Sequence, residues 1–220
     1  MDMRTQLIAA ASQQLEQSPL GDISTRAVCD AVGVGQPVLY RLFGDKDGLL
    51  AAVIDAVWAE YLETKRAATA TDDPVADLRD GWNAHIAFAL HHPNAYRLLF
   101  STALATKADA LNQATELLVA VLNRVAAKGL VQMEPEHAAQ IVMAANTGLA
   151  LQLLRQPHAK HVHSTVKRVR EATIRAITTE GSHKPHGTRV ATATLRAQLP
   201  QHTGFTQAEA ALLDEWLQRF

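Results

Sequence analysis

Apolar residues recur at helical spacing along nearly the whole chain, and this period constrains the fold more than any other feature. The clearest examples are Leu7, Ile8, Ala11 and Leu15 near the start, and Val162, Val166, Val169 and Ile177 farther along. We find no run of alternating apolar and polar residues, the pattern that is typical of a half-buried strand. Hydrophobic residues make up 48% of the 220, which is enough for a sizeable core. The sequence therefore predicts an all-α protein.

Proline, glycine and helix-capping residues divide this pattern into separate helices. Pro19 and Gly21 end the first helix, and Ser24 is the expected N-cap of a short second one. The residues expected to be buried around this second helix are Ile23, Ala27, Val28 and Ala31. A third short helix ends at Gly44, with Asp45 as the next N-cap. Further helices are expected at about 46–69, 74–92, 93–104, 109–128, 135–156 and 162–181.

The chain after residue 180 carries two further signals. The segment GSHKPHG, residues 181–187, is rich in turn-forming residues and is the expected linker. Thr206 and Glu209 have the spacing of a capping box and precede an apolar run. We therefore expect a C-terminal helix that docks on another surface.

Cysteine usage indicates the cellular compartment, whereas the net charge does not indicate the type of partner. The net charge is −1 with histidine neutral, which neither favours nor opposes a nucleic-acid partner. The single cysteine, Cys29, excludes an internal disulfide framework and suits a reducing compartment. The N-terminus lacks the pattern of a signal peptide, and no run approaches 18 apolar residues. We expect a cytoplasmic protein with no membrane partner.

Two short helices joined by a glycine-containing turn, at about 24–43, form a helix-turn-helix pattern. Gly33 lies where the turn favours a positive φ. In such a unit the second helix enters the major groove with its N-terminal end first. If Gly35 is the N-cap, Pro37 falls in the first turn, where it breaks no intrahelical hydrogen bond. The polar start of this helix and its apolar rear face, which includes Leu39, fit that role.

Residues 4–55 resemble the DNA-binding domain of the tetracycline-repressor (TetR) family. The matching residues are Ala10, Ala11, Thr25, Arg26, Val32, Gly33, Val34, Leu39, Tyr40, Phe43, Lys46, Leu49 and Leu50. The resemblance implies a DNA-binding domain at 1–46, a connecting helix at 46–69 and a ligand-binding and dimerisation domain at 70–220. It also implies three partners: a double-stranded DNA operator, a small-molecule effector and a second copy of the chain, as a homodimer. No cofactor is expected.

The resemblance further implies which residues contact DNA. They are Thr25, Arg26, Gln36, Pro37, Val38, Tyr40, Arg41 and Lys46. Thr25 and Tyr40 carry hydroxyls suited to phosphate oxygens, and Lys46 offers a cation at a helix N-terminus. Arg26 and Gln36 are expected to read base edges, because their side chains match guanine and adenine respectively.

The chain departs from residues that are frequent in the family at three positions. Gly35, Val38 and Leu42 stand where polar residues are common, so a helix cap and two DNA contacts are missing. Val38 can instead pack against a thymine methyl group, and Arg41 suits either a phosphate or a base. The first 46 residues are not basic overall, so DNA binding would depend on geometry and on two half-sites of a dimer.

The remaining chain offers candidates for an effector pocket and a dimer interface. The expected lining residues are mostly apolar with a few polar groups: Trp82, His85, Ile86, Phe88, Tyr96, Leu99, Phe100, Leu118, Met143, Asn146 and Thr147. Such a lining suits an uncharged or weakly polar, aromatic or lipophilic effector. The stripe from Val162 to Ile177 either joins a four-helix dimer interface or packs within the chain.

These features favour a ligand-responsive transcriptional repressor that binds a near-palindromic operator as a homodimer and is released by its effector. The alternative is a helical small-molecule-binding or interaction protein with weak or lost DNA binding. No nucleophile–base set or phosphate loop indicates an enzyme. His158, His161 and His163 cluster in sequence, but no cysteine or acidic residue completes a metal site, so none is expected.

Overall fold

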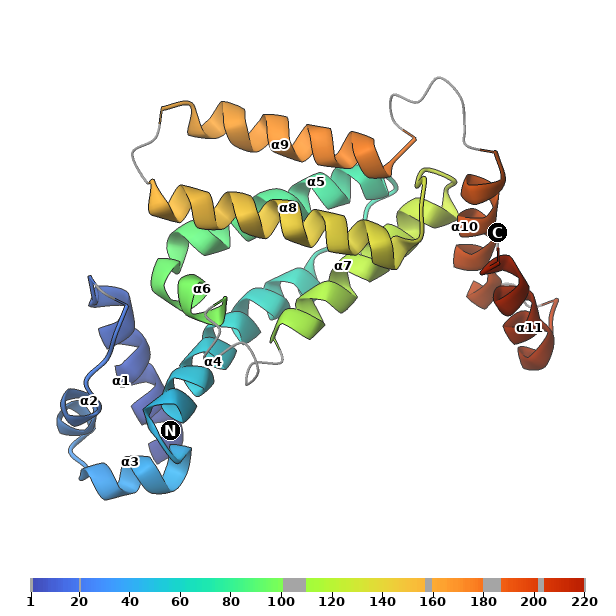
Figure 1. Ribbon diagram of the computed structural model, residues 1–220. Coiled ribbons are helices and arrows are strands. Elements are labelled where there is room, and N and C mark those ends of the chain that lie inside the picture. Colours follow the sequence, from blue (N-terminus) through green and yellow to red (C-terminus); the bar gives the residue numbers. More distant parts are fainter. Residues whose placement is uncertain are drawn as a thin grey trace. The chain divides into compact units, whose positions relative to one another are not determined.

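The structure is a computed structural model that describes residues 2–19, 21–100, 110–156, 160–179, 187–201 and 204–219. Every named element in these residues is helical, which confirms the all-α prediction (Figure 1). The elements are α1 (Met3–Gln17), α2 (Thr25–Val32), α3 (Gln36–Phe43), α4 (Lys46–Ala67), α5 (Pro74–His91), α6 (Pro93–Leu99), α7 (Ala110–Ala127), α8 (Pro135–Arg155), α9 (Val162–Ile177), α10 (Gly187–Gln198), the 3-10 helix η1 (Leu199–Gln201) and α11 (Gln207–Leu217). No helix of the described part is long and apolar enough to cross a membrane.

Polar side chains fix the starts of these helices, as the sequence predicts. Ser24 accepts a hydrogen bond from the Ala27 N–H, and Asp45 accepts one from the Gly48 N–H at 2.6 Å. Such caps satisfy backbone donors that have no partner inside the helix. Thr206 forms the predicted capping box with Glu209 at the start of α11. Local sequence therefore determines where α2, α4 and α11 begin.

The chain forms two compact units. The first comprises residues 1–68 and 87–114, and the second comprises residues 69–86 and 115–220. In the first unit, α1 packs against α2, α4 and α6 and buries Leu7, Ala11 and Leu15 (Figure 1). Asn94 of α6 donates from Nδ2 to the carbonyl oxygens of Leu15 and Ser18, each at 2.8 Å. These bonds satisfy carbonyls at the end of α1.

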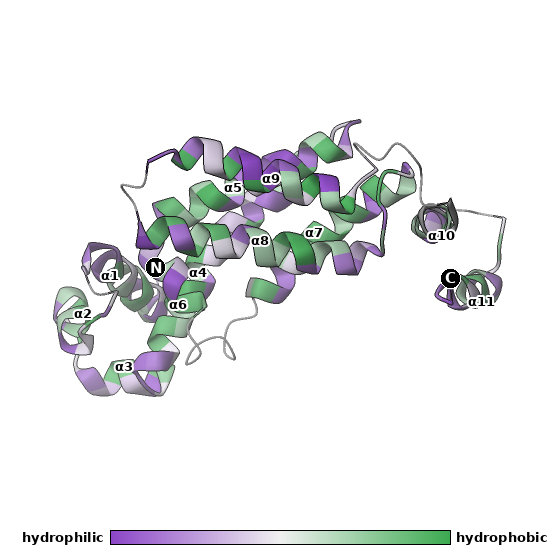
Figure 2. Ribbon diagram, turned by 45° about the horizontal axis from the view of Figure 1, so that its top comes forward, coloured by the Kyte–Doolittle hydropathy of each residue, from purple (hydrophilic) through white to green (hydrophobic). Residues whose placement is uncertain are grey.

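In the second unit, α8 and α9 lie side by side and antiparallel (Figures 1 and 2). Ile174 and Ile177 of α9 are fully buried. Glu171 of α9 accepts hydrogen bonds from Arg170 at 2.9 Å and from Arg79 of α5 at 3.2 Å. Burial raises the pKa of Glu171, but these two guanidinium groups outweigh it, so the net pKa is lowered. One side of α9 is therefore held by packing within the chain.

The structure corrects two expectations about the helices. Ala27 and Ala31 are exposed rather than buried, because α2 turns Val28 and Cys29 inward. An eight-residue helix with one buried face has room for few inward positions. The helix α10 was not predicted, since it follows the expected linker and begins at a glycine. Arg196 bonds this helix to Glu134 and Asp214.

Some expected boundaries differ or lie outside the described residues. The helix predicted at 93–104 is described as α6 up to Leu99, and residues 101–109 lie outside the described part. The helix predicted to close near Gly181 ends earlier, at Ile177. Residues 181–186 of the expected linker also lie outside the described part.

Candidate nucleic-acid interface and effector helices

The helix α3 is short because glycines bound it at both ends. Gly33, with φ 73°, makes the turn after α2, and Gly35 is the N-cap without a side-chain hydrogen bond. Pro37 is the second residue of α3, where a missing N–H breaks no helical bond. Leu39 is 0% exposed, whereas Tyr40 is 43% exposed. The apolar side of α3 thus holds the helix against the unit and leaves its polar side in solvent.

The predicted base-reading residues lie at the start of the two short helices. Arg26, in the first turn of α2, has an 85% exposed side chain whose Nε lies 4.0 Å from Asp30. Gln36, the first residue of α3, donates from Nε2 to Thr25 Oγ1 at 3.5 Å. This long contact brings the N-terminal ends of α2 and α3 to one surface. Pro37 and Arg41 are exposed on α3 as well, and Val38 is half-buried.

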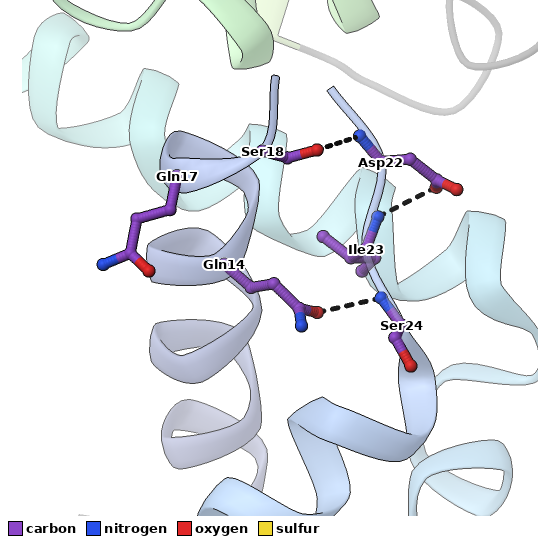
Figure 3. A pocket seen from close by; sticks show the side chains of 6 residues that line it. All are labelled: Gln14, Gln17, Ser18, Asp22, Ile23 and Ser24. Carbon is purple, nitrogen blue, oxygen red and sulfur yellow. Dashed lines mark hydrogen bonds between the residues drawn. The ribbon is translucent and has the colours of Figure 1, made fainter. Parts of the chain in front are cut away.

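Lys46 has an acidic partner that the sequence did not reveal. Its Nζ lies 2.5 Å from Asp22 Oδ1, and this hydrogen bond lowers the pKa of Asp22. Hydrogen bonds within the loop before α2 orient Asp22. The Asp22 N–H donates to Ser18 Oγ, and Asp22 Oδ1 accepts from the Ile23 N–H (Figure 3). The predicted phosphate contact of Lys46 therefore competes with a carboxylate of the same chain.

The loop beside Asp22 borders an open surface groove of about 390 Å³. Its lining residues are Gln14, Gln17, Ser18, Asp22, Ile23 and Ser24 (Figure 3). Gln14 Oε1 accepts from the Ser24 N–H at 2.9 Å, so α1 and the loop are tied together across the groove. Five of its six lining residues are polar and the groove is open to solvent, whereas a site for an apolar effector is enclosed and mostly apolar.

The cations of the first 46 residues differ in what they can offer a phosphate. The guanidinium of Arg4 lies 5.4 Å from the centre of the Phe43 ring, so it joins α1 to α3. Lys46 and Arg26 face carboxylates. Arg41 is exposed and has no ion pair with a described residue. Arg41 is therefore the cation of this surface that competes least with other groups of the chain.

The predicted effector residues divide between the two compact units. In the first unit Phe88, Tyr96 and Leu99 are buried and Phe100 is half-buried. Phe88 lies 4.8 Å from Trp58 and 4.4 Å from Tyr61, measured between ring centres. Sequence reasoning missed these two partners, although their spacing of three residues places them on one face of α4. Burial raises the pKa of Tyr61, with a smaller effect from Tyr96.

In the second unit Trp82, His85 and Ile86 are buried on one face of α5, and Asn146 is buried on α8. The structure brings two of them together, because Asn146 Nδ2 donates to the Trp82 carbonyl oxygen at 3.4 Å. The other predicted residues of this unit, Leu118, Met143 and Thr147, are half-buried.

The histidine cluster gains no support from the geometry. His161 and His163 are exposed, and His158 lies outside the described residues. No group of three histidine, cysteine or acidic side chains in the described part is arranged to hold a metal ion.

Comparisons with known proteins agree with this architecture. Among curated relatives, the nucleoid occlusion factor SlmA of Marinomonas sp. (strain MWYL1) is 33% identical over 112 residues, which are 50% of this chain and 56% of that protein. The HTH-type transcriptional regulator BetI of Stenotrophomonas maltophilia (strain R551-3) is 29% identical over 149 residues, 59% of this chain and 76% of that one. The chain thus spans little more than half of SlmA and about three quarters of BetI.

Solved structures share the fold at low identity. SmeT, the repressor of the Stenotrophomonas maltophilia multidrug efflux pump SmeDEF, has a TM-score of 0.65 and 18% identity, over 84% of this chain and 95% of its own. The fatty acid degradation regulator FadR of Bacillus halodurans has a TM-score of 0.64 and 19% identity, over 79% and 95%.

Family matches cover both parts of the chain. Residues 7–53 match the family described as "Bacterial regulatory proteins, tetR family", which includes the whole of α2 and α3. Residues 78–211 match the "Tetracyclin repressor-like, C-terminal domain", which is more than half of the chain. The chain belongs to the TetR family of bacterial regulatory proteins and carries a helix-turn-helix.

Proposed function

We propose that the protein is a repressor that binds a near-palindromic operator as a homodimer and is released by a small, mostly apolar effector. The observation that carries this proposal is the orientation of α3. Leu39 is buried while Gln36, Tyr40 and Arg41 are exposed, so the helix offers its polar side to a groove. We assign DNA binding to residues 1–46 and effector binding and dimerisation to residues 70–220.

In this proposal base reading and phosphate binding fall to different residues. Arg26 and Gln36 reach base edges, where a bidentate contact is worth about 1–3 kcal/mol of discrimination. Thr25, Tyr40 and Lys46 contact phosphates, which fixes register without reading sequence. Val38 and Pro37 add apolar contact along α3, and Arg41 supplies a further phosphate or base contact.

The dimer interface is assigned to α8 and α9. Ala144 and Gly148 are exposed on α8 one turn apart, and a side chain added at Gly148 would meet nothing within 4 Å. Ala172 and Ala176 are likewise exposed on α9. Small residues let the helices of a second copy approach closely, so a four-helix interface fits this surface. The two recognition helices would then reach half-sites about 34 Å apart.

Release by an effector is assigned to α4, which directly follows the helix-turn-helix. In the first unit, Trp58 of α4 meets the Phe88 ring edge-on and stacks on Tyr96, and Tyr61 of α4 stacks on Phe88. An effector that disturbs the packing of these rings would move α4 and, with it, the spacing of the two recognition helices. Such coupling is typically worth about 1–3 kcal/mol.

One observation favours a second candidate, a ligand-binding helical protein with weak DNA binding. Lys46 and Arg26 both face carboxylates, Asp22 and Asp30, and these reduce the positive potential of the surface. Non-specific affinity for DNA would then be low, since it depends on cations that neutralise phosphates.

A titration of the DNA that flanks its own gene, followed by fluorescence anisotropy at several salt concentrations, tests the proposal. Selective, salt-dependent binding is expected. Arg26→Ala and Gln36→Ala should relax the sequence preference, whereas Lys46→Ala should weaken all sequences alike and reduce the salt slope by about 1. Arg219→Ala, a cation at the far end of the chain, serves as the control. The absence of selective binding at any flanking site would favour the second candidate.

A further inference from the structure

Two buried polar atoms of the second unit have no hydrogen-bond partner among the described residues. They are the indole Nε1 of Trp82 on α5 and Oδ1 of Asn146 on α8. Trp82 is 2% exposed and Asn146 is 4% exposed, so bulk water does not reach them. A buried polar group without a partner is destabilising, and native proteins keep few of them. Both atoms therefore lack the hydrogen bond that a buried polar group needs from the described part of the chain.

The hydrogen bond between these two residues decides which atom of the amide is left over. Asn146 Nδ2 donates to the carbonyl oxygen of Trp82. The opposite orientation of the amide would set its oxygen against that carbonyl oxygen, with no proton between them. Oδ1 is consequently the atom without a partner. An indole N–H only donates and an amide oxygen only accepts, so a single group that satisfies both atoms has to accept one hydrogen bond and donate another.

We propose that Trp82 Nε1 and Asn146 Oδ1 bind one neutral group of the effector that both accepts and donates, a hydroxyl or a carboxamide. This inference rests on the proposed ligand-responsive function. A carboxylate can accept from Trp82 but has no proton for Asn146, and an ammonium group has the opposite defect. A ketone satisfies Trp82 alone.

The surroundings of the pair indicate what the rest of the effector is like. On α8 the buried neighbours of Asn146 are Val142, Leu149 and Ala150. On α5 Trp82 is followed on the same face by His85 and Ile86. All of these side chains except His85 are apolar, so the remainder of the effector gains by being largely apolar too. A site whose buried polar groups match one substituent discriminates strongly against analogues that lack it.

A single water molecule also accepts and donates, and it is the alternative occupant. Binding of matched small molecules to the full-length protein, measured by calorimetry without DNA, separates the two. The octyl probes are n-octanol, octanamide, hexyl methyl ketone and octanoate, and the aromatic probes are benzyl alcohol, benzamide, acetophenone and benzoate. On at least one scaffold the alcohol and the amide should bind about tenfold more tightly than the ketone and the carboxylate.

Two substitutions assign that preference to the pair. Asn146→Leu removes the acceptor, so the alcohol and the amide should lose their advantage over the ketone. Trp82→Phe removes the donor while keeping an aromatic ring, so ketone and amide should both weaken severalfold. Trp216→Phe is the matched control, because it makes the same change at a tryptophan of α11 that is 52% exposed, and it should leave the ratio of alcohol to ketone affinity unchanged.

Several outcomes overturn the proposal: equal affinity for alcohol and ketone, no binding of any probe, or a preference that survives Asn146→Leu, as expected if water alone fills the site. Operator binding, measured separately by anisotropy, keeps the two proposals apart. If the alcohols and amides bind by this rule without changing operator affinity, the site stands and the ligand-responsive function fails. If the ketones release operator as well as the alcohols do, the function stands and the site fails.

Discussion

Polar side chains occupy opposite environments on α3 and between α5 and α8. Gln36, Tyr40 and Arg41 are exposed on α3, where water satisfies them until DNA replaces it. Trp82 and Asn146 are buried between α5 and α8, where an unsatisfied atom is costly. An exposed group can therefore be replaced with little effect on the fold. Replacing a buried group changes the free energy of unfolding as well as binding. The two regions should respond differently to substitution.

The largest effect is expected on the buried side of α3. Leu39→Ala removes a side chain that is 0% exposed, so it should lower the free energy of unfolding by about 2–5 kcal/mol. Chemical denaturation followed by circular dichroism measures this loss. DNA binding should weaken only in step with the fraction of unfolded protein.

Leu42→Ala is the control for that prediction. Leu42 belongs to the same helix but is 36% exposed, so the same deletion should change stability by no more than about 0.5 kcal/mol. Equal losses at Leu39 and Leu42 would mean that α3 is held by both sides, and that its outer surface is not available to a groove.

The DNA-binding end was the easier part to predict from sequence, because its signals are local. Ser24 and Asp45 cap helices within three residues of themselves, and Gly33 makes its turn alone. Each signal depends on the chemistry of one or two residues, so it can be read without the fold. The assignment of individual DNA contacts remains a prediction.

What could not be predicted depends on residues that are far apart in the chain. Asp22 reaches Lys46 across 24 positions, and Trp58 meets Phe88 across 30, counted from their residue numbers. Nothing in the local pattern of either residue indicates its partner. The same holds for Asn146, because the local sequence of α8 does not indicate that the Trp82 carbonyl lies beside its amide.

A large effect on assembly is expected from Ala144→Trp on α8. Ala144 is exposed in the single chain, so the variant should fold without strain. The bulky indole should, however, prevent a second copy from packing against α8. Dimer affinity should fall at least about a hundredfold, or roughly 2.7 kcal/mol, and operator affinity with it. Sedimentation velocity measures the dimer.

Ala59→Trp tests whether any exposed tryptophan would do the same. Ala59 is an exposed alanine of α4, outside the proposed interface, so its replacement should leave the dimer intact. A dimer that tolerates Ala144→Trp as well would place the interface elsewhere and leave the small residues of α8 unexplained.

A smaller effect on stability is expected from Glu171→Gln in the second unit. Arg170 and Arg79 lower the pKa of Glu171 below its ordinary value of 4.5 despite burial. A lowered pKa in the folded state means that the carboxylate stabilises the fold above about pH 4.5, and that this contribution is lost as pH falls further. At neutral pH the substitution should cost about 1–2 kcal/mol, between a surface and a buried ion pair.

Denaturation curves from pH 3 to pH 7 test whether the stabilisation by Glu171 is lost, and not gained, as the pH falls. The difference between wild type and Glu171→Gln should be constant near neutrality and shrink below pH 4.5. Operator affinity at neutral pH should not change, since Glu171 belongs to a half-buried ion pair of α5 and α9 and is not among the residues assigned to DNA. A difference that grew on acidification would reverse the role given to this carboxylate.

The smallest effect, and the one confined to the exposed surface, is expected from Asp22→Asn. Asp22 and Lys46 form an exposed pair, with 65% and 39% of their side chains exposed, which is worth about 0.2–1 kcal/mol. Removing the carboxylate frees the ammonium for a phosphate, so operator affinity should rise about twofold to fivefold at low salt. Asparagine keeps Oδ1, which can still accept from the Ile23 N–H, so stability should hold.

The gain from Asp22→Asn should vanish near 1 M salt, where the Debye length is about 3 Å, and also in a Lys46→Gln background. Anisotropy titrations of the single and double variants provide this cycle. A gain that persists without Lys46 would mean that Asp22 repels DNA directly. An unchanged affinity would mean that Lys46 makes no phosphate contact, and Arg41 would then be the main cation of the surface. Neither result would bear on the proposed effector contacts of Trp82 and Asn146, because DNA is proposed to bind the exposed surface and the effector the interior.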